Sequence, residues 1–149
     1  MKQTKLKTLI QDIESQDFAT SHGINVHAQL SKIVYQNNQF IGNQNIISRI
    51  TSNQELSEIM GSLSRAEVPV AGYVNGVFLS RRIDRLYVNP NTKTVIILDY
   101  KTDTNKETNY EKYRAQLSEY YKLVKQIYPD FNVMCKILWT NDFTLENII

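Results

Sequence analysis

Residues Arg82–Thr102 read RIDRLYVNPNTKTVIILDYKT, and this stretch decides the fold because it describes a complete β-hairpin. The run VIIL before Asp99 is typical of a central strand that is covered on both faces. The sequence NPNT at residues 89–92 is a turn signal between the two strands. The stretch therefore predicts neighbouring strands that bring Asp84 close to Asp99 and Lys101.

The charged residues at the end of this hairpin are candidates for chemistry. Asp99 and Lys101 share one face of their strand because side chains alternate. Ionisable groups that end a buried strand are costly unless they bind something. Carboxylates on adjacent strands suit Mg²⁺ or Mn²⁺, so Asp84 and Asp99 are candidate ligands, with Lys101 beside them to stabilise charge on a phosphate. A surface salt bridge is the alternative interpretation.

The chain before the hairpin is expected to be largely helical. Residues 5–13 have apolar side chains at helical spacing, and a second helix is predicted from about residue 23 to residue 37, with a loop after it. Isoleucines within residues 46–50 indicate a further helical turn. Residues 52–55, Ser-Asn-Gln-Glu, have the form of a capping box that opens another helix.

From Ala66 the periodicity becomes that of β-structure. The sequence AEVPVAGYVNG predicts a strand, and because it contains Pro69 the strand should either lie at a sheet edge or have a break there. Asn75-Gly76 is a hairpin signal, so this strand and the two of the central stretch form an antiparallel meander.

A long helix is expected next, from about residue 110 to residue 128, followed by an apolar strand, FNVMCKILWT. The tail NDFTLENII is interpreted as a turn of helix. This order predicts an α/β (α+β) fold in one domain, with a helical N-terminal part (1–65) packing on the site and an αβ core (66–140).

Four more residues are candidates for the site because of their predicted positions. Glu67 opens the first strand and can approach the same sheet end, and His27 lies on a helix that packs near the sheet. Gln116 and Tyr120 are four residues apart and share one face of the long helix. The alternatives are an exposed acid, a hydrogen-bonded core histidine, and a packed tyrosine beside a surface amide.

The composition is that of an ordinary globular protein, with 149 residues, 42% hydrophobic and 21% charged residues, and a net charge of +2. The lone cysteine, Cys135, excludes an iron–sulfur cluster and is expected to be a buried thiol in a reducing, cytoplasmic compartment. No segment approaches the roughly 18–20 apolar residues that span a bilayer, so no membrane is expected. Arg82 and Arg85 flank Asp84 and either hold DNA phosphates or form a solvated face.

Five short motifs together resemble the nuclease domain of the RecB/AddA group within the PD-(D/E)XK nuclease superfamily. They are GINVH, the acid in AEVPV, GVFLSRRIDRL, VIILDYKT and QLSEY, in the order of the family. The resemblance implies a restriction-endonuclease-like α-β-β-β-α-β core with a mixed sheet flanked by helices. It also implies Mg²⁺-dependent hydrolysis of DNA in repair or recombination, with Mn²⁺ as a substitute, and a helicase domain or subunit as partner.

The resemblance also implies roles for individual residues. His27, Asp84 and Asp99 resemble the metal ligands of the family, with the backbone carbonyl of Tyr100 as a further ligand. Lys101 resembles its catalytic lysine.

The other matched positions have supporting roles in the family. Gln116 and Tyr120 resemble the helix motif that supports the site and contacts DNA. Glu67 corresponds to an auxiliary acid on the first core strand. The absence of cysteine ligands excludes the iron–sulfur branch, and exonuclease action is favoured over endonuclease action. A module of the same fold that binds DNA or a helicase without cleaving is the alternative, and a site-specific restriction enzyme is a third.

Overall fold

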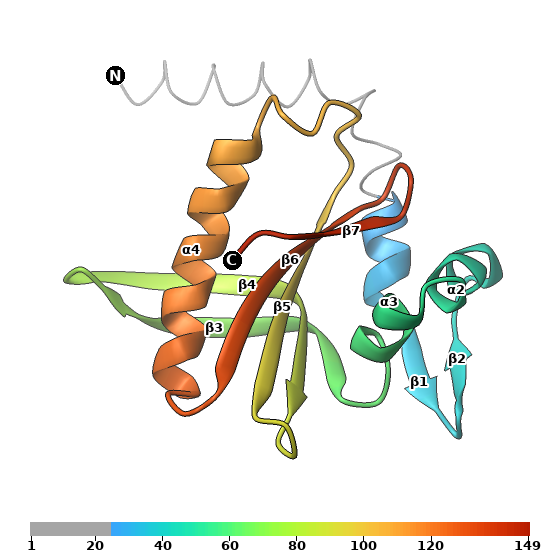
Figure 1. Cartoon of the computed structure of the whole chain (residues 1–149), viewed down its shortest axis with the longest axis horizontal. Helices are drawn as coiled ribbons and strands as arrows, with labels where there is room; N and C mark the ends of the chain where they lie inside the picture. Colours follow the sequence, from blue (N-terminus) through green and yellow to red (C-terminus); the bar gives the residue numbers. More distant parts are fainter. Residues whose placement is uncertain (1–24) are drawn as a thin grey trace.

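A five-stranded mixed sheet forms the centre of the computed structural model, which describes residues 25–149 (Figure 1). Its order is β3-β4-β5-β6-β7, and all neighbours are antiparallel except β5 and β6, which are parallel. The strands are β3 (Ser64–Val74), β4 (Val77–Asn89), β5 (Thr94–Lys101), β6 (Asn132–Trp139) and β7 (Thr144–Asn147). The predicted mixed sheet, including its meander of three strands, is confirmed.

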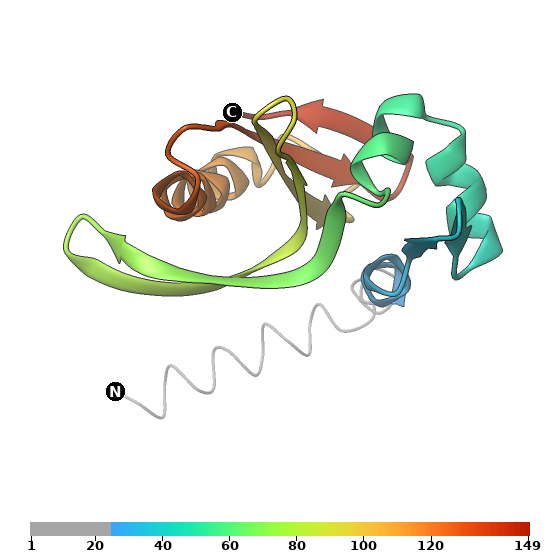
Figure 2. The ribbon, with the colours of Figure 1, turned by 90° about the horizontal axis from the view of Figure 1, so that it is seen from below.

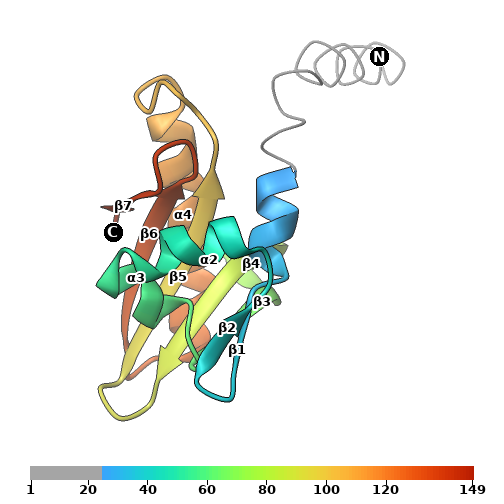
Figure 3. The same cartoon turned by 90° about the vertical axis from the view of Figure 1, so that its right-hand side faces the viewer.

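Helices cover both faces of the sheet. The long helix α4 (Tyr110–Ile127) lies on one face, while α2 (Gln44–Thr51), α3 (Gln54–Ile59) and the helical residues 25–31 lie on the other (Figure 3). Two buried apolar clusters fill the layers, one between the sheet and α4 and one between the sheet and the other helices. This arrangement is the expected α-β-β-β-α-β core flanked by helices.

β5 is the central strand that its apolar run predicts. Residues 95–100 are all buried, and they alternate between the two clusters, with Val95 and Ile97 on the α4 side and Ile96 and Leu98 on the other. α4 connects β5 to the parallel β6, because parallel neighbours need a crossover rather than a tight turn. Cys135 of β6 is buried, as predicted, and burial raises the pKa of its thiol to about 12.

The β3–β4 hairpin is long and curved, and its tip extends past α4 (Figure 2). Asn75 and Gly76 form the predicted two-residue turn, with φ values of 52° and 78° that suit a type I′ hairpin. β3 is an edge strand, which accommodates Pro69 as predicted.

The predicted helix of residues 23–37 is wrong in its second half. The helical residues end at 31, and a small hairpin of β1 (Val34–Gln36) and β2 (Gln39–Ile41) follows. Asn37 and Asn38 have φ values of 53° and 64°, so they form a type I′ turn rather than a helix end and a loop. The predicted helix of residues 5–13 and the start of the second helix lie outside the described residues.

Two further expectations needed correction. Asn53 rather than Ser52 caps α3, because its side chain accepts from the Leu56 N–H at 3.1 Å. The tail forms β7 instead of a helical turn, since the residues after Trp139 turn tightly and Thr144 returns opposite it in register. No helix within residues 25–149 is long and apolar enough to cross a membrane.

Candidate active site

β4 and β5 separate at the point where the site begins. Their register runs from Asn89 opposite Thr94 to Arg85 opposite Leu98 and goes no further. Beyond it, the Tyr100 N–H donates to Asp84 Oδ2 at 2.8 Å, so a side chain takes the place of the next strand carbonyl. The Asp84 carboxylate is thereby fixed between the two strands, and its second oxygen, Oδ1, lies next to His27.

β4 also changes faces at Asp84. Ile83 and Leu86 both belong to the core on the α4 side, although residues three apart in a regular strand point to opposite faces. Glu67 and Asp84 lie between the register pairs Ala66–Arg85 and Val68–Ile83 without forming a pair themselves, and Glu67 has a left-handed φ of 54°. Such a conformation costs of the order of 1–3 kcal/mol in a non-glycine residue and is typical of functional sites. Both strands are therefore distorted at the candidate site residues, β4 at Asp84 and β3 at Glu67.

His27, Glu67 and Asp84 meet at this distortion. His27 Nε2 lies 3.0 Å from Asp84 Oδ1 and 3.6 Å from Glu67 Oε1, and one ligand atom from each residue lies within 4.8 Å of the others. The His27 ring also packs edge-on against Tyr100, with the ring centroids 5.3 Å apart. The structure thus brings together three of the predicted residues from a helix and two strands.

Arg85 holds the helical residues 25–31 against the sheet. Its buried guanidinium donates to the carbonyls of Leu30 and Ile33 at 3.1 and 2.9 Å, to the Ser64 hydroxyl at 3.1 Å and to the Tyr100 hydroxyl at 3.1 Å. The expected DNA contact at Arg85 does not fit this geometry, because the side chain is only 2% exposed. Its role is instead structural, and it determines where His27 lies. Arg82 is exposed, as a DNA contact requires.

Asp99 and Lys101 lie side by side on the α4 side of the site. Lys101 Nζ is 3.0 Å from Asp99 Oδ2 and donates to Gln116 Oε1 at 3.0 Å, while Gln116 Nε2 donates to the Tyr120 hydroxyl at 2.8 Å. Of the predicted pair on the long helix, Gln116 contacts the lysine directly and Tyr120 contacts Gln116. Asp99 lies beside Asp84, but it does not belong to the group formed by His27, Glu67 and Asp84.

Tyr113 and Asp103 are contacts of the lysine that sequence reasoning missed. Lys101 Nζ lies 4.4 Å from the centroid of the Tyr113 ring, within the range of a cation–π interaction. The Tyr113 hydroxyl donates to Asp103 at 2.8 and 2.9 Å, and Asn109 Nδ2 donates to the same carboxylate at 3.0 Å. The signal in the sequence is that Tyr113 lies one turn before Gln116 in the long helix, whereas Asp103 lies in the polar stretch before that helix and has no comparable signal.

The pKa values of the site reflect burial and close charge. Burial raises the pKa of Asp99 to about 7; Lys101 opposes this effect and the nearby Asp84 adds to it. Burial also acts to raise the pKa of Asp84, but hydrogen bonds from His27 and from the Tyr100 N–H outweigh it and hold the pKa below its usual value. The hydrogen bond to Asp84 raises the pKa of His27. Together these effects favour the charged forms of His27 and Asp84, and they disfavour ionisation of Asp99 relative to an exposed aspartate.

The donor set fits a divalent cation. Imidazole and carboxylate ligands together suit ions such as Mn²⁺, and carboxylates suit Mg²⁺. Asp99 Oδ2 is buried and receives no hydrogen bond from any of residues 25–149, since Lys101 approaches it outside hydrogen-bonding geometry. Lys101 offsets only part of the cost of burying this carboxylate, because burial still raises the pKa of Asp99, and a divalent cation would offset more of it. The Tyr100 carbonyl stays a predicted ligand.

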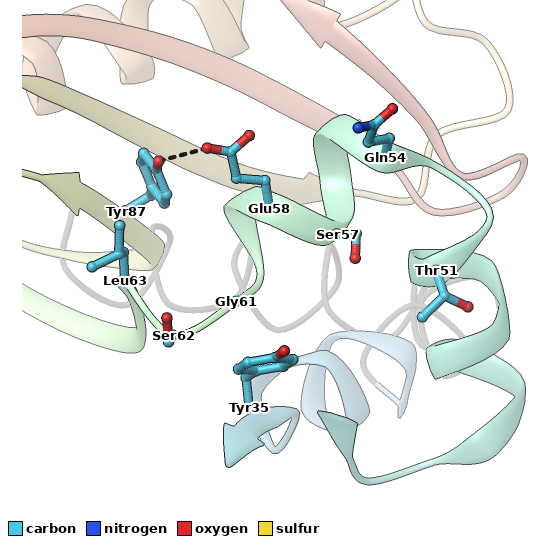
Figure 4. Close-up of a pocket in the computed structure, with 9 residues that line it drawn as sticks. All are labelled: Tyr35, Thr51, Gln54, Ser57, Glu58, Gly61, Ser62, Leu63 and Tyr87. Atoms are coloured by element: carbon cyan, nitrogen blue, oxygen red, sulfur yellow. Dashed lines mark hydrogen bonds between the residues drawn. The ribbon is translucent and has the colours of Figure 1, made fainter. Parts of the chain in front are cut away.

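A separate pocket of about 490 Å³ lies between α3, β1 and residues 61–63, which lead into β3 (Figure 4). Its lining includes Glu58, which accepts a hydrogen bond from the Tyr87 hydroxyl at 3.0 Å. None of its lining residues belongs to the group of His27, Glu67 and Asp84. The pocket is therefore distinct from the charged site.

Comparison with known proteins agrees with the geometry of the site. The family model described as "PD-(D/E)XK nuclease superfamily" matches residues 44–133, more than half of the chain. The matched span contains both aspartates, Glu67, Lys101 and the Gln116–Tyr120 pair, and His27 lies before it. The comparison with curated proteins finds no match.

Proposed function

This chain belongs to the PD-(D/E)XK nuclease superfamily, and from that premise we propose that it is a divalent-metal-dependent deoxyribonuclease of the RecB/AddA type. The observation that carries the proposal is the meeting of Asp84, Asp99 and Lys101 where β4 and β5 separate, with His27 and Glu67 beside them. A structural ion pair between Asp99 and Lys101 would not need the left-handed backbone at Glu67.

In this proposal His27, Glu67, Asp84 and Asp99 would hold Mg²⁺, with Mn²⁺ as a substitute. When bound, the cation would polarise the scissile phosphate and lower the pKa of attacking water. Asp84 is pre-positioned for this task, because its two oxygens are already directed toward the Tyr100 N–H and His27. Its carboxylate therefore needs little reorganisation to act as a ligand.

Lys101 would act on the substrate rather than on the cation. Its ammonium is held by Asp99 and Gln116 at 3.0 Å each and by the Tyr113 ring, and its side chain is 17% exposed. A fixed, desolvated positive charge stabilises the negative charge that develops on a phosphodiester during hydrolysis. Tyr120 supports it indirectly by accepting from Gln116.

The finer parts of the proposal rest on the resemblance to the RecB/AddA group. They are a helicase domain or subunit as partner, a role in DNA repair or recombination, exonuclease action, and a cytoplasmic location. We further propose that the chain is a single nuclease domain, in which residues 1–65 pack on the site and residues 66–140 form the core.

The test is digestion of end-labelled linear DNA and closed circular DNA with Mg²⁺, with Mn²⁺ and with EDTA. Wild type is expected to shorten linear DNA from its ends only when a divalent cation is present, and Lys101→Met and Asp84→Asn to lose this activity. Cutting of circles would establish endonuclease action instead. Binding of DNA without cleavage under either cation would favour the non-cleaving module, and undiminished cleavage by Lys101→Met would refute the mechanism.

A further inference from the structure

The tip of the β3–β4 hairpin carries an exposed aromatic pair that the site does not use. Tyr73 and Phe78 are 67% and 58% exposed, and their ring centroids are 5.4 Å apart across the two strands. Val77 beside them is 58% exposed. A cluster of large apolar side chains in solvent is typical of a binding surface rather than of a solvated hairpin end.

These rings belong to one continuous face of the hairpin. Val68, Val70 and Val74 of β3 pack toward α4, so the alternate positions of β3 point away from that helix. The register pairs on this outer ribbon face are Pro69 with Arg82, Ala71 with Ser80, and Tyr73 with Phe78, and all six residues are exposed. In Figure 2 the ribbon runs from the helix of residues 25–31 to the free tip.

The face connects the aromatic tip to the candidate active site. Arg82 is two residues from Asp84, and Pro69 is two residues from Glu67. Phe78 is six residues from Asp84, which is about 20 Å along a strand. A linear ligand of several nucleotides can therefore contact the tip and the site at the same time.

The charges on this surface favour a polyanion. The outer ribbon face contains no acidic residue, and Lys122 of α4 lines a shallow hollow beside Tyr73 at the tip. Neither Arg82 nor Lys122 forms an ion pair within the part of the chain that the structure describes. Lys122 belongs to the helix that covers the opposite face, so it can reach a strand on the outer ribbon face only around the edge strand β3. Arg82 lies on the face itself, and exposed rings beside such a cation suit the bases and phosphates of a single strand.

We propose that the outer ribbon face binds the single strand of DNA that leads to the active site. Bases stack on Tyr73 and Phe78, and phosphates contact Arg82 and Lys122. This inference rests on the proposed nuclease function and adds a binding surface to it. The stacked bases would hold the strand at a distance from the reacting phosphate, so the face acts on binding rather than on the chemical step.

Two features that hold the hairpin do not involve the rings, so the hairpin is expected to keep its shape when they are replaced. Gln126 Nε2 of α4 donates to the Tyr73 carbonyl at 2.9 Å, a contact made to the backbone. The Asn75-Gly76 turn is also independent of the side chains at the tip. Leucine at both ring positions would retain an apolar pair while removing the flat faces on which bases stack.

The experiment measures binding of the full chain to a labelled single-stranded oligothymidylate by fluorescence anisotropy in EDTA, where cleavage is absent. The double variant Tyr73→Leu/Phe78→Leu is expected to bind about tenfold or more weakly. The double variant Tyr73→Trp/Phe78→Trp is expected to bind as well as wild type. The matched control is Val34→Ala/Ile41→Ala, which changes another exposed cross-strand pair, 47% and 42% exposed, and is expected to leave affinity unchanged.

Unchanged affinity of the double leucine variant would overturn the inference, as would equal losses in the double leucine variant and the control. Wild type without affinity for the oligothymidylate would overturn it as well. The proposed nuclease function is judged separately, by cation-dependent cleavage and its loss in Lys101→Met. A protein that binds through its rings but never cleaves would therefore retain this inference and refute the nuclease proposal.

Discussion

The replacement Asp99→Asn is expected to stabilise the protein when divalent cations are removed. Asp99 is 3% exposed, and one of its oxygens has no hydrogen-bond donor among residues 25–149. Asparagine keeps the shape of the protonated carboxyl but cannot ionise. The variant therefore removes the cost of a buried carboxylate while retaining most of its packing.

The pKa of Asp99 determines the size and the sign of this effect. Burial raises the pKa from the usual 3.8 to about 7, so between these values the folded carboxyl keeps a proton that the unfolded one has lost. The free energy of unfolding of wild type therefore falls as the pH rises from about 4 to about 7 and is constant above that. Three pKa units correspond to an upper limit of about 4 kcal/mol. Asp99→Asn avoids this loss, so its advantage over wild type is expected to be about 1–4 kcal/mol at high pH and to vanish toward pH 4.

Urea unfolding in EDTA across this pH range measures the difference directly. Addition of Mn²⁺ is expected to stabilise wild type more than the variant, because the cation would offset the charge of the carboxylate. The control is Asp142→Asn, since a hydrogen bond from Thr144 holds the pKa of that half-exposed carboxyl below its usual value. Its contribution is present above the unfolded pKa and is lost as the pH falls, which is the opposite trend. A variant at Asp99 that is less stable than wild type at every pH would refute the reasoning.

Four other predictions concern residues around the site. Lys101→Met is expected to reduce cation-dependent DNA cleavage by about 100-fold or more while leaving the cation affinity measured by calorimetry within a small factor of wild type. Tyr113→Leu is expected to lower the cleavage rate by roughly 3- to 30-fold through loss of the cation–π contact, whereas Tyr113→Phe retains the ring and most of the rate; equal rates for the two variants would contradict this role. Arg85→Met is expected to lower the free energy of unfolding by roughly 2–4 kcal/mol, because it leaves buried carbonyls without donors. Arg82→Ala is expected to leave stability unchanged and to reduce the salt dependence of DNA binding by a slope of about one.

The hairpin and its charged end were predictable because they depend on local rules. The apolar run before Asp99 identifies a buried strand, and strand alternation alone places Lys101 on the same face. The turn signal at Asn75-Gly76 and the edge position of Pro69 are equally local. In each case the residue type restricts the backbone within two or three positions, so one sequence is enough to place it.

The small hairpin after residue 31 was missed because its signals are weak. Its two strands have three residues each, too few for alternation to be distinguished from the helical pattern that precedes them. Asn37-Asn38 is compatible with a helix end as well as with a type I′ turn, and the choice depends on what the following residues pack against. Tertiary packing rather than propensity decides such a case.

The role of Arg85 could not be read from the sequence, because strand alternation fails where β4 changes faces. A regular strand would place Arg85 on the same side as Ile83, which packs toward α4. The change of face at Asp84 turns Arg85 toward the opposite side of the sheet, where it meets the carbonyls that end the helix of residues 25–31. In the sequence, an arginine beside a candidate catalytic acid resembled a DNA contact, but in the fold its buried side chain binds backbone carbonyls.

The hydrogen bonds of Arg85 connect the stability of the fold to the geometry of the candidate metal ligands His27, Glu67 and Asp84. His27 is the one member of the group of three that comes from outside the sheet, and Arg85 is bonded to the end of the same short helix. Asp84 and Glu67, in contrast, lie within β4 and β3, and the Tyr100 N–H also holds the Asp84 carboxylate. Loss of the Arg85 contacts should therefore displace His27 while leaving both carboxylates in place. In Arg85→Met the affinity for Mn²⁺ should fall toward that of His27→Ala, and in the double variant the two effects should not add, because both remove the same ligand.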